Sequence, residues 1–259
     1  MNTRTLSFAA VAWCWLGCAG LGTAVTHPTQ PVAWKGYWLK QHQRKLTPPL
    51  EAAALAEGHG RTVLLVPGLT IGEEFFAPMK TRLERDGFRP VLYEDPELLA
   101  TGLVPAAQRL KARVDELVAQ TGEEKIDIVA ECVGGVTART YVAMFGGDQR
   151  IDHLVTFVSP HHGSMPASIA STVTGWQGMR DIERNSPLMQ ALEDHPVDPR
   201  VHFTSIYSCD DGYLWPAGTA KVEGAQNVEI CKGHVGHFDG FWDPGVYRSI
   251  VAGLDAPAR

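Results

Sequence analysis

The sequence has no run of basic residues longer than a few positions, and no internal repeat or low-complexity segment stands out. Its formal net charge is −6 at pH 7, which excludes nucleic acid as the expected partner. The absence of a repeat excludes a repeat architecture. What is present is 259 residues of ordinary globular composition, 44% hydrophobic and 20% charged, which is enough for one sizeable α/β domain.

Charged residues are also missing from the N-terminal region, where none occurs between Arg4 and Lys35 apart from one titratable histidine. A positive start, an apolar core and the small-residue sequence "GTA" predict a secretory signal over residues 1–24, and hence a secreted or periplasmic protein. Two alternatives are an uncleaved membrane anchor and a lipoprotein signal ending in "WLGC". We expect an N-terminal arm over residues 25–60 and the main domain over residues 61–259.

Cysteine is scarce, with five in the chain, and two of them lie in the predicted signal. The three that remain are Cys132, Cys209 and Cys231. An odd number in an oxidising compartment predicts one disulfide and one free thiol. Cys209 and Cys231 end successive predicted strands, so we expect them to pair and Cys132 to remain free. The alternative is three reduced, buried cysteines.

Short apolar runs alternate with helical patterns from residue 62 onward. This alternation predicts βαβ units, right-handed crossovers and a mostly parallel sheet of about six strands with helices on both faces. The clearest helices are expected over residues 105–120 and 134–146. The strands are expected over residues 62–66, 90–94, 126–130, 153–158, 201–208 and 227–231.

Two of these strands end in sequences that suit nucleophilic catalysis. The sequence "IDIVAECVGG" places Cys132 between an apolar strand and a helix, with Ala130 and Gly134 leaving space for a strained turn. The helix N-terminus after Cys132 is expected to lower the pKa of the thiol. The sequence "VPGL" after the first strand forms a tight turn. The N–H groups of Leu69 and Val133 would then form an oxyanion hole.

The last two strands are followed by an acid and a histidine. "SIYSCDD" offers Asp210 or Asp211, and "CKGHVGH" offers His234 or His237. Nucleophile, acid and histidine in this chain order are typical of α/β hydrolases.

From about Thr62 to Leu254 the sequence resembles the small secreted bacterial lipases of lipase class 2, in the α/β-hydrolase superfamily. The resemblance rests on "IVAECVGG", on "FTSIYS" followed by Asp, and on "GAQNVEI" followed by a Gly-His loop. It matches the acid to Asp211, with Pro216 five positions later, and the histidine to His237 through the following "DP" and "GVYRSIVAGL". His234 remains the alternative if the loop is one residue shorter.

The sequence departs from this family at the elbow itself. The family has serine where this chain has Cys132, and commonly histidine where it has Glu131. "CVGG" resembles the cysteine-containing lipase box of polyhydroxyalkanoate synthases, which gives chemical precedent for a thiol nucleophile. We interpret Glu131 as a solvated elbow residue, with a role in tuning the thiol or contacting substrate as the alternative. Ser159 and Ser164 are the nearest rival nucleophiles.

The resemblance implies an α/β-hydrolase fold and an exported carboxylic ester hydrolase without metal or organic cofactor. Its catalytic triad would consist of Cys132, His237 and Asp211. Its substrate would be a small-molecule or lipid ester with an apolar acyl part, and such a substrate would allow contact with a membrane or lipid interface. The same acyl-cysteine would also support acyl transfer or thioesterase action. A non-catalytic, lipase-like binding protein is the alternative from another class. No Cys/His spacing typical of zinc is present, so we expect no metal.

Overall fold

Six parallel strands form a single sheet in the order β2-β1-β3-β4-β5-β6. The computed structural model describes residues 55–69, 71–232 and 235–256. All six predicted strands are present, and the prediction of an α/β fold with a parallel sheet is confirmed. The strands are β1 (Thr62–Val66), β2 (Arg89–Leu92), β3 (Ile126–Glu131), β4 (Ile151–Phe157), β5 (His202–Ser208) and β6 (Gln226–Ile230).

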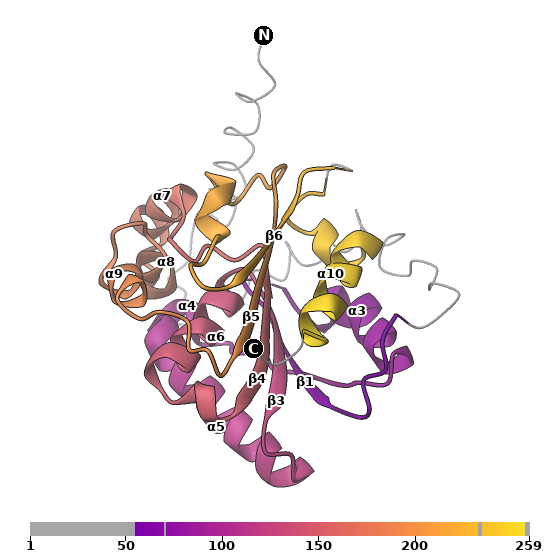
Figure 1. The fold of residues 1–259 in the computed structure, drawn as a ribbon. Coiled ribbons are helices and arrows are strands. Elements are labelled where there is room, and N and C mark those ends of the chain that lie inside the picture. Colours follow the sequence, from indigo (N-terminus) through magenta and orange to yellow (C-terminus); the bar gives the residue numbers. More distant parts are fainter. Residues whose placement is uncertain (1–54, 70, 233–234, 257–259) are drawn as a thin grey trace.

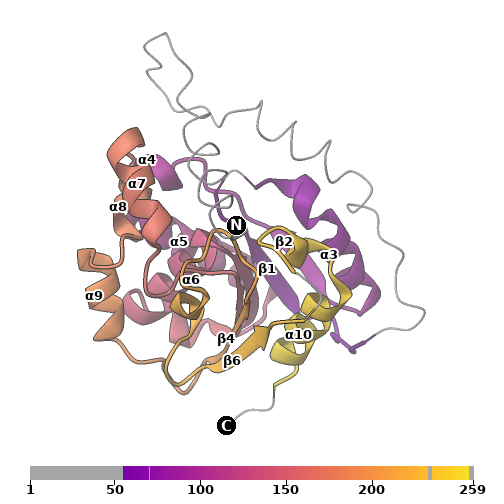
Figure 2. The same ribbon diagram turned by 90° about the horizontal axis from the view of Figure 1, so that it is seen from above.

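Helices cover both faces of this sheet (Figure 1). Helices α3 and α10 lie on one face, and α5 and α6 lie on the other, as the view from above also shows (Figure 2). The α-helices are α3 (Glu73–Arg85), α4 (Leu98–Thr101), α5 (Leu103–Thr121), α6 (Val133–Met144), α7 (Met165–Thr174), α8 (Gln177–Asp181), α9 (Pro187–Glu193) and α10 (Pro244–Leu254).

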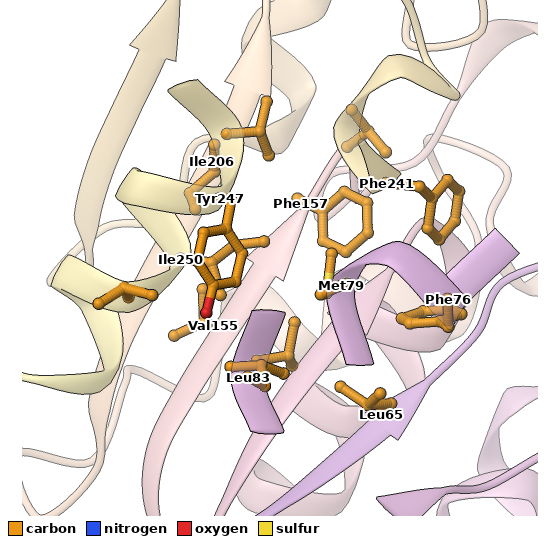
Figure 3. Packing of buried hydrophobic residues seen from close by; sticks show 14 of the residues in the cluster. Leu65, Phe76, Met79, Leu83, Val155, Phe157, Ile206, Phe241, Tyr247 and Ile250 are labelled. Carbon is orange, nitrogen blue, oxygen red and sulfur yellow. The ribbon is translucent and has the colours of Figure 1, made fainter. Parts of the chain in front are cut away.

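The core has two layers because successive strand residues point to opposite faces. In β1, Val63 and Leu65 join the cluster under α3 and α10, whereas Leu64 and Val66 join the cluster under α5 and α6. Figure 3 shows the first cluster, in which helix side chains meet side chains of the strands. Its labelled members are Leu65, Phe76, Met79, Leu83, Val155, Phe157, Ile206, Phe241, Tyr247 and Ile250.

Helices α4, α7, α8 and α9 pack together beside α5 and α6 around a third apolar cluster. Helices α7, α8 and α9 occupy the region between β4 and β5 for which the sequence predicts loops and helices. Helix α10 begins at Asp243, whose Oδ1 accepts the N–H groups of Gly245 and Val246 at 2.7 and 2.9 Å. This cap and the proline at the first helical position fix where the last helix starts.

The strand order of the sheet reverses between β1 and β3, which makes this place a topological switch point. The chain places β2 on one side of β1 and then returns to place β3 on the other side. Ligands of open α/β sheets bind at such a switch point, beyond the carboxyl ends of the strands. Here those ends carry Gly68 and Leu69 after β1 and Cys132 after β3.

The predicted signal over residues 1–24 and most of the predicted arm over residues 25–60 lie outside the described residues. Among the helices of the described ranges, none combines the length and the apolar character needed to cross a bilayer.

Candidate active site

Cys132 occupies a sharp turn between β3 and α6. Its backbone has φ 51° and ψ −125°, a conformation that residues with side chains rarely adopt. A Cβ added to Gly134, two residues later, would lie 2.5 Å from the carbonyl oxygen of Pro67, so the turn requires glycine there. Cys132 forms no disulfide, and the residue as a whole is partly exposed. The strand and helix therefore hold a cysteine side chain at the strand end.

His237 and Asp211 meet beside this cysteine. The Nδ1 atom of His237 donates to Oδ2 of Asp211 at 2.8 Å, and both side chains are buried. The second carboxylate oxygen, Oδ1, accepts the N–H groups of Tyr213 and Leu214 at 2.8 and 2.9 Å. Because Nδ1 is engaged by Asp211, Nε2 is the nitrogen that remains for Cys132, whose sulfur lies within 4.8 Å of a ring nitrogen of His237.

The structure thus brings together three of the residues singled out from the sequence, Cys132, His237 and Asp211. Asp210, the alternative acid, is exposed. His234, the alternative histidine, lies outside the described residues.

Aromatic rings that the sequence analysis missed hold the histidine in place. The ring of Tyr213 lies 4.9 Å from that of His237, and the ring of Phe238 approaches it edge-on at 5.3 Å. The hydroxyl of Ser208 donates to the carbonyl oxygen of Val235, which ties the histidine loop to the end of β5. The only sequence signal for Tyr213 is an aromatic residue two positions after the predicted acid.

The turn after β1 lies directly against the nucleophile. A Cβ added to Gly68 would lie 2.6 Å from the Cβ atom of Cys132. Leu69 follows this glycine, and Val133 is the first residue of α6, whose N–H has no partner within the helix. Within the described ranges, neither the Leu69 N–H nor the Val133 N–H donates to an acceptor in the protein. Two N–H groups are therefore available near the thiol.

Glu131 is buried, with 1% of its surface exposed, so its interpretation as a solvated elbow residue is wrong. Its Oε2 atom accepts the N–H of Gly68 at 2.7 Å. Its Oε1 atom lies 3.4 Å from Nε2 of His237. The reason is local geometry: the turn after β1 offers an N–H toward the end of β3, and the carboxylate folds back to accept it.

The electrostatics of the site favour protonated side chains. Burial and the Glu131 carboxylate raise the pKa of the Cys132 thiol more than His237 lowers it, so the expected lowering by the helix N-terminus does not dominate. Burial alone would lower the pKa of His237, but Asp211 and Cys132 raise it well above its ordinary value. Attack by the sulfur therefore requires one proton to leave the coupled Cys132–His237 pair.

The other cysteines form the predicted disulfide between Cys209 and Cys231, at the ends of β5 and β6. The rival serines lie in structural positions. Ser159 is fully buried and its hydroxyl donates to the carbonyl oxygen of Phe157 at 3.3 Å. The hydroxyl of Ser164 donates to the carbonyl oxygen of Tyr213 at 3.2 Å.

His161, between these serines, is also buried and packs in the domain interior. Its Nε2 atom lies 3.0 Å from Oγ1 of Thr156. Burial, the Arg139 guanidinium and His162 hold the pKa of His161 well below its ordinary value. His161 is therefore a neutral histidine of the core.

No family model matches the sequence. Many solved structures are similar to the chain, and three of them match over most of its length as follows. A lipase from Bacillus licheniformis in its mature form has a TM-score of 0.59 and 15% identity, covering 79% of this chain and 92% of that chain. Aspergillus fumigatus lipase B has a TM-score of 0.65 and 14% identity, covering 81% of this chain and 56% of that chain. An alpha/beta hydrolase enzyme from the sediment metagenome of the Mar Chica lagoon has a TM-score of 0.52 and 19% identity, covering 76% of this chain and 91% of that chain.

At these identities the similarity establishes the fold. The chain has the α/β-hydrolase fold, with Cys132 at the strand end where the switch point of the sheet lies.

Proposed function

We propose that the protein is a carboxylic ester hydrolase that acts through an acyl-cysteine intermediate on Cys132. The observation that carries this proposal is the placement of the Cys132 sulfur beside the hydrogen-bonded His237–Asp211 pair, at the strand end where this fold binds its ligands. The comparison with lipases supports an ester as the substrate class.

Each group has one role in the proposed reaction. The Cys132 sulfur attacks the ester carbonyl carbon, and Nε2 of His237 takes the thiol proton. The N–H groups of Leu69 and Val133 hold the oxyanion of the tetrahedral intermediate. His237 then gives its proton to the leaving alcohol, and a thioester remains on Cys132. Water, activated by His237, hydrolyses the thioester to the acid and restores the thiol.

Export of the mature domain over residues 61–259 is part of this proposal. The disulfide between Cys209 and Cys231 supports it, because such bonds persist in oxidising compartments. The apolar acyl part of the substrate and contact with a lipid interface are likewise proposed from the lipase comparison and the sequence resemblance.

The experiment is turnover of p-nitrophenyl butyrate by the exported protein and by Cys132→Ala and Cys132→Ser. We expect turnover in the parent and none above background in Cys132→Ala. Product analysis with added alcohol acceptors separates hydrolysis from acyl transfer through the same intermediate. Absence of turnover in the parent, with binding of the ester still measurable, would favour a non-catalytic binding protein instead.

A further inference from the structure

The proposed ester hydrolysis gives no role to one carboxylate oxygen of Glu131. Its Oε1 atom is buried and, among the described residues, forms no hydrogen bond. Its neighbour is Nε2 of His237 at 3.4 Å, while the other oxygen is held by the N–H of Gly68. Buried polar atoms are normally hydrogen-bonded, so a buried carboxylate oxygen that among the described residues has only an ion pair with His237 has capacity for a further ligand.

The atoms around this oxygen are the donors of a zinc site. Oε1 of Glu131, Sγ of Cys132 and Nε2 of His237 all lie within 4.8 Å of one another. Zinc binds carboxylate oxygen, thiolate sulfur and imidazole nitrogen, and ligand atoms about 2.1 Å from a tetrahedral ion lie about 3.4 Å apart. The separation of Oε1 from Nε2 already equals this spacing. The sulfur lies within 4.8 Å of both atoms, and a longer Zn–S bond of about 2.3 Å sets a wider spacing of about 3.6 Å for it.

The neighbours of these donors orient them for a metal ion. Asp211 accepts the Nδ1–H of His237, which fixes the ring and leaves Nε2 free to bind. Gly68 holds one oxygen of Glu131 and leaves Oε1. A thiolate and a carboxylate also neutralise the charge of one Zn²⁺.

Two other groups of potential ligands lack these properties. Cys209 and Cys231 are consumed by their disulfide. Asp127 is already paired with Arg61 at 3.0 Å and with Nδ1 of His153 at 2.8 Å.

We propose that Glu131, Cys132 and His237 bind one Zn²⁺ ion, with water in the fourth position, and that the bound ion blocks acylation of Cys132. On binding, the Cys132 thiol and Nε2 of the His237 imidazolium each release one proton to solvent, and no electron is transferred. The sulfur lone pair and Nε2 are then both occupied by the metal, so neither can act on an ester. The blocking effect rests on the proposed ester hydrolysis, whereas the metal site does not.

The metal site is tested with Co²⁺, which reports its ligands optically, on the metal-free full chain. We expect one Co²⁺ per chain, a near-ultraviolet thiolate-to-cobalt charge-transfer band, and the intense visible bands of a four-coordinate ion that Zn²⁺ then displaces. Cys132→Ala removes the charge-transfer band. Asp211→Asn weakens binding about 10- to 100-fold, as loss of an outer-shell partner does, and Glu131→Gln weakens it by at least as much. His195→Gln, at an exposed histidine, leaves binding unchanged.

A measurement on the unaltered protein removes any dependence on the folding of the variants. Zn²⁺ should protect Cys132 from alkylation by iodoacetamide, and EDTA should restore the reaction. Absence of the charge-transfer band, absence of protection, or Co²⁺ binding by Glu131→Gln as tight as that of the parent would each overturn the zinc site.

Turnover of p-nitrophenyl butyrate then separates the two proposals. Two results together support both the ester hydrolysis and the zinc site. Zn²⁺ should inhibit the parent in a way that EDTA reverses, and any residual activity of Glu131→Gln should resist inhibition by Zn²⁺. If the charge-transfer band forms with Co²⁺ but the metal-free protein shows no turnover, the ester hydrolysis is overturned and the metal site stands. Turnover without the band, or turnover that Zn²⁺ increases, would overturn the blocking zinc site and leave the ester hydrolysis standing.

Discussion

Replacement of Gly134 by alanine should separate the two strand ends that form the site. The new Cβ would lie 2.5 Å from the carbonyl oxygen of Pro67 and 2.6 Å from that of Val66. Ordinary contact begins at 3.4 Å, so β1 and α6 must move apart by about 3.4 − 2.5 = 0.9 Å. Both contacts are to backbone atoms, which cannot rotate away as a side chain can.

This movement has two measurable consequences. Overpacking of this kind costs about 1–3 kcal/mol of the free energy of unfolding. The same shift moves the N–H of Leu69 relative to that of Val133, and misplacement of catalytic groups by about 1 Å reduces activity by about 10²-fold. We therefore expect kcat/KM for p-nitrophenyl butyrate to fall by about 10²-fold in Gly134→Ala, with the protein still folded.

The assay is urea unfolding together with ester kinetics, with Gly218→Ala as the matched control. An added Cβ at Gly218 meets nothing within 4 Å, so this variant should keep the stability and the activity of the parent. Parental stability and kcat/KM in Gly134→Ala would refute the tight contact between the elbow and the turn after β1. An equal loss in both variants would do the same.

Three further predictions address the acid, a buried histidine and the disulfide. Asp211→Asn should lower kcat by about 10²- to 10⁴-fold with little change in KM, because general-base action of the histidine is lost. Asp210→Asn should keep the kcat of the parent. A larger loss of kcat in Asp210→Asn than in Asp211→Asn would assign the acid of the triad to Asp210 instead. The low pKa of His161 means that only the unfolded chain takes up its proton as pH falls below about 6.5, so stability drops by up to about 1.4 kcal/mol per pH unit. His237, whose pKa is raised, contributes the opposite slope above about pH 6.5. The difference in urea unfolding between the parent and His161→Gln should therefore show the His161 slope from about pH 6.5 to about 5, and an identical pH dependence of the two proteins would contradict it. Non-reducing peptide mapping should find Cys209 linked to Cys231; any bridge to Cys132 would exclude it as the nucleophile.

The sheet could be predicted from the sequence because most strands, such as β1 and β3, are short, largely apolar runs bounded by breakers, while β6 alternates polar and apolar residues. The parallel order then required the residues after β1, β3, β5 and β6 to meet at one edge, and this brought Cys132 together with His237 and Asp211. Helices α3 and α10 were not predicted as elements. Helix α3 contains Pro78, and α10 contains Gly253, and both residues weaken a helical pattern that packing on the sheet supports.

The burial of Glu131 could not be predicted from the sequence. A charged residue beside an elbow is normally expected to face water, and only the position of the Gly68 N–H shows why this one turns inward. The contact joins residues 63 positions apart. The proposed zinc donors likewise have no local Cys/His spacing, since His237 joins the adjacent Glu131 and Cys132 only after folding.

The most direct test of the central claim is the mass of the intact protein after a brief pulse of p-nitrophenyl butyrate, followed by peptide mapping. We expect one butyryl group per chain, located on the peptide that contains Cys132, which accumulates and then decays at the rate of turnover. The adduct should be absent in Cys132→Ala. Turnover without this adduct, or an adduct that persists in Cys132→Ala, would contradict catalysis through an acyl-cysteine.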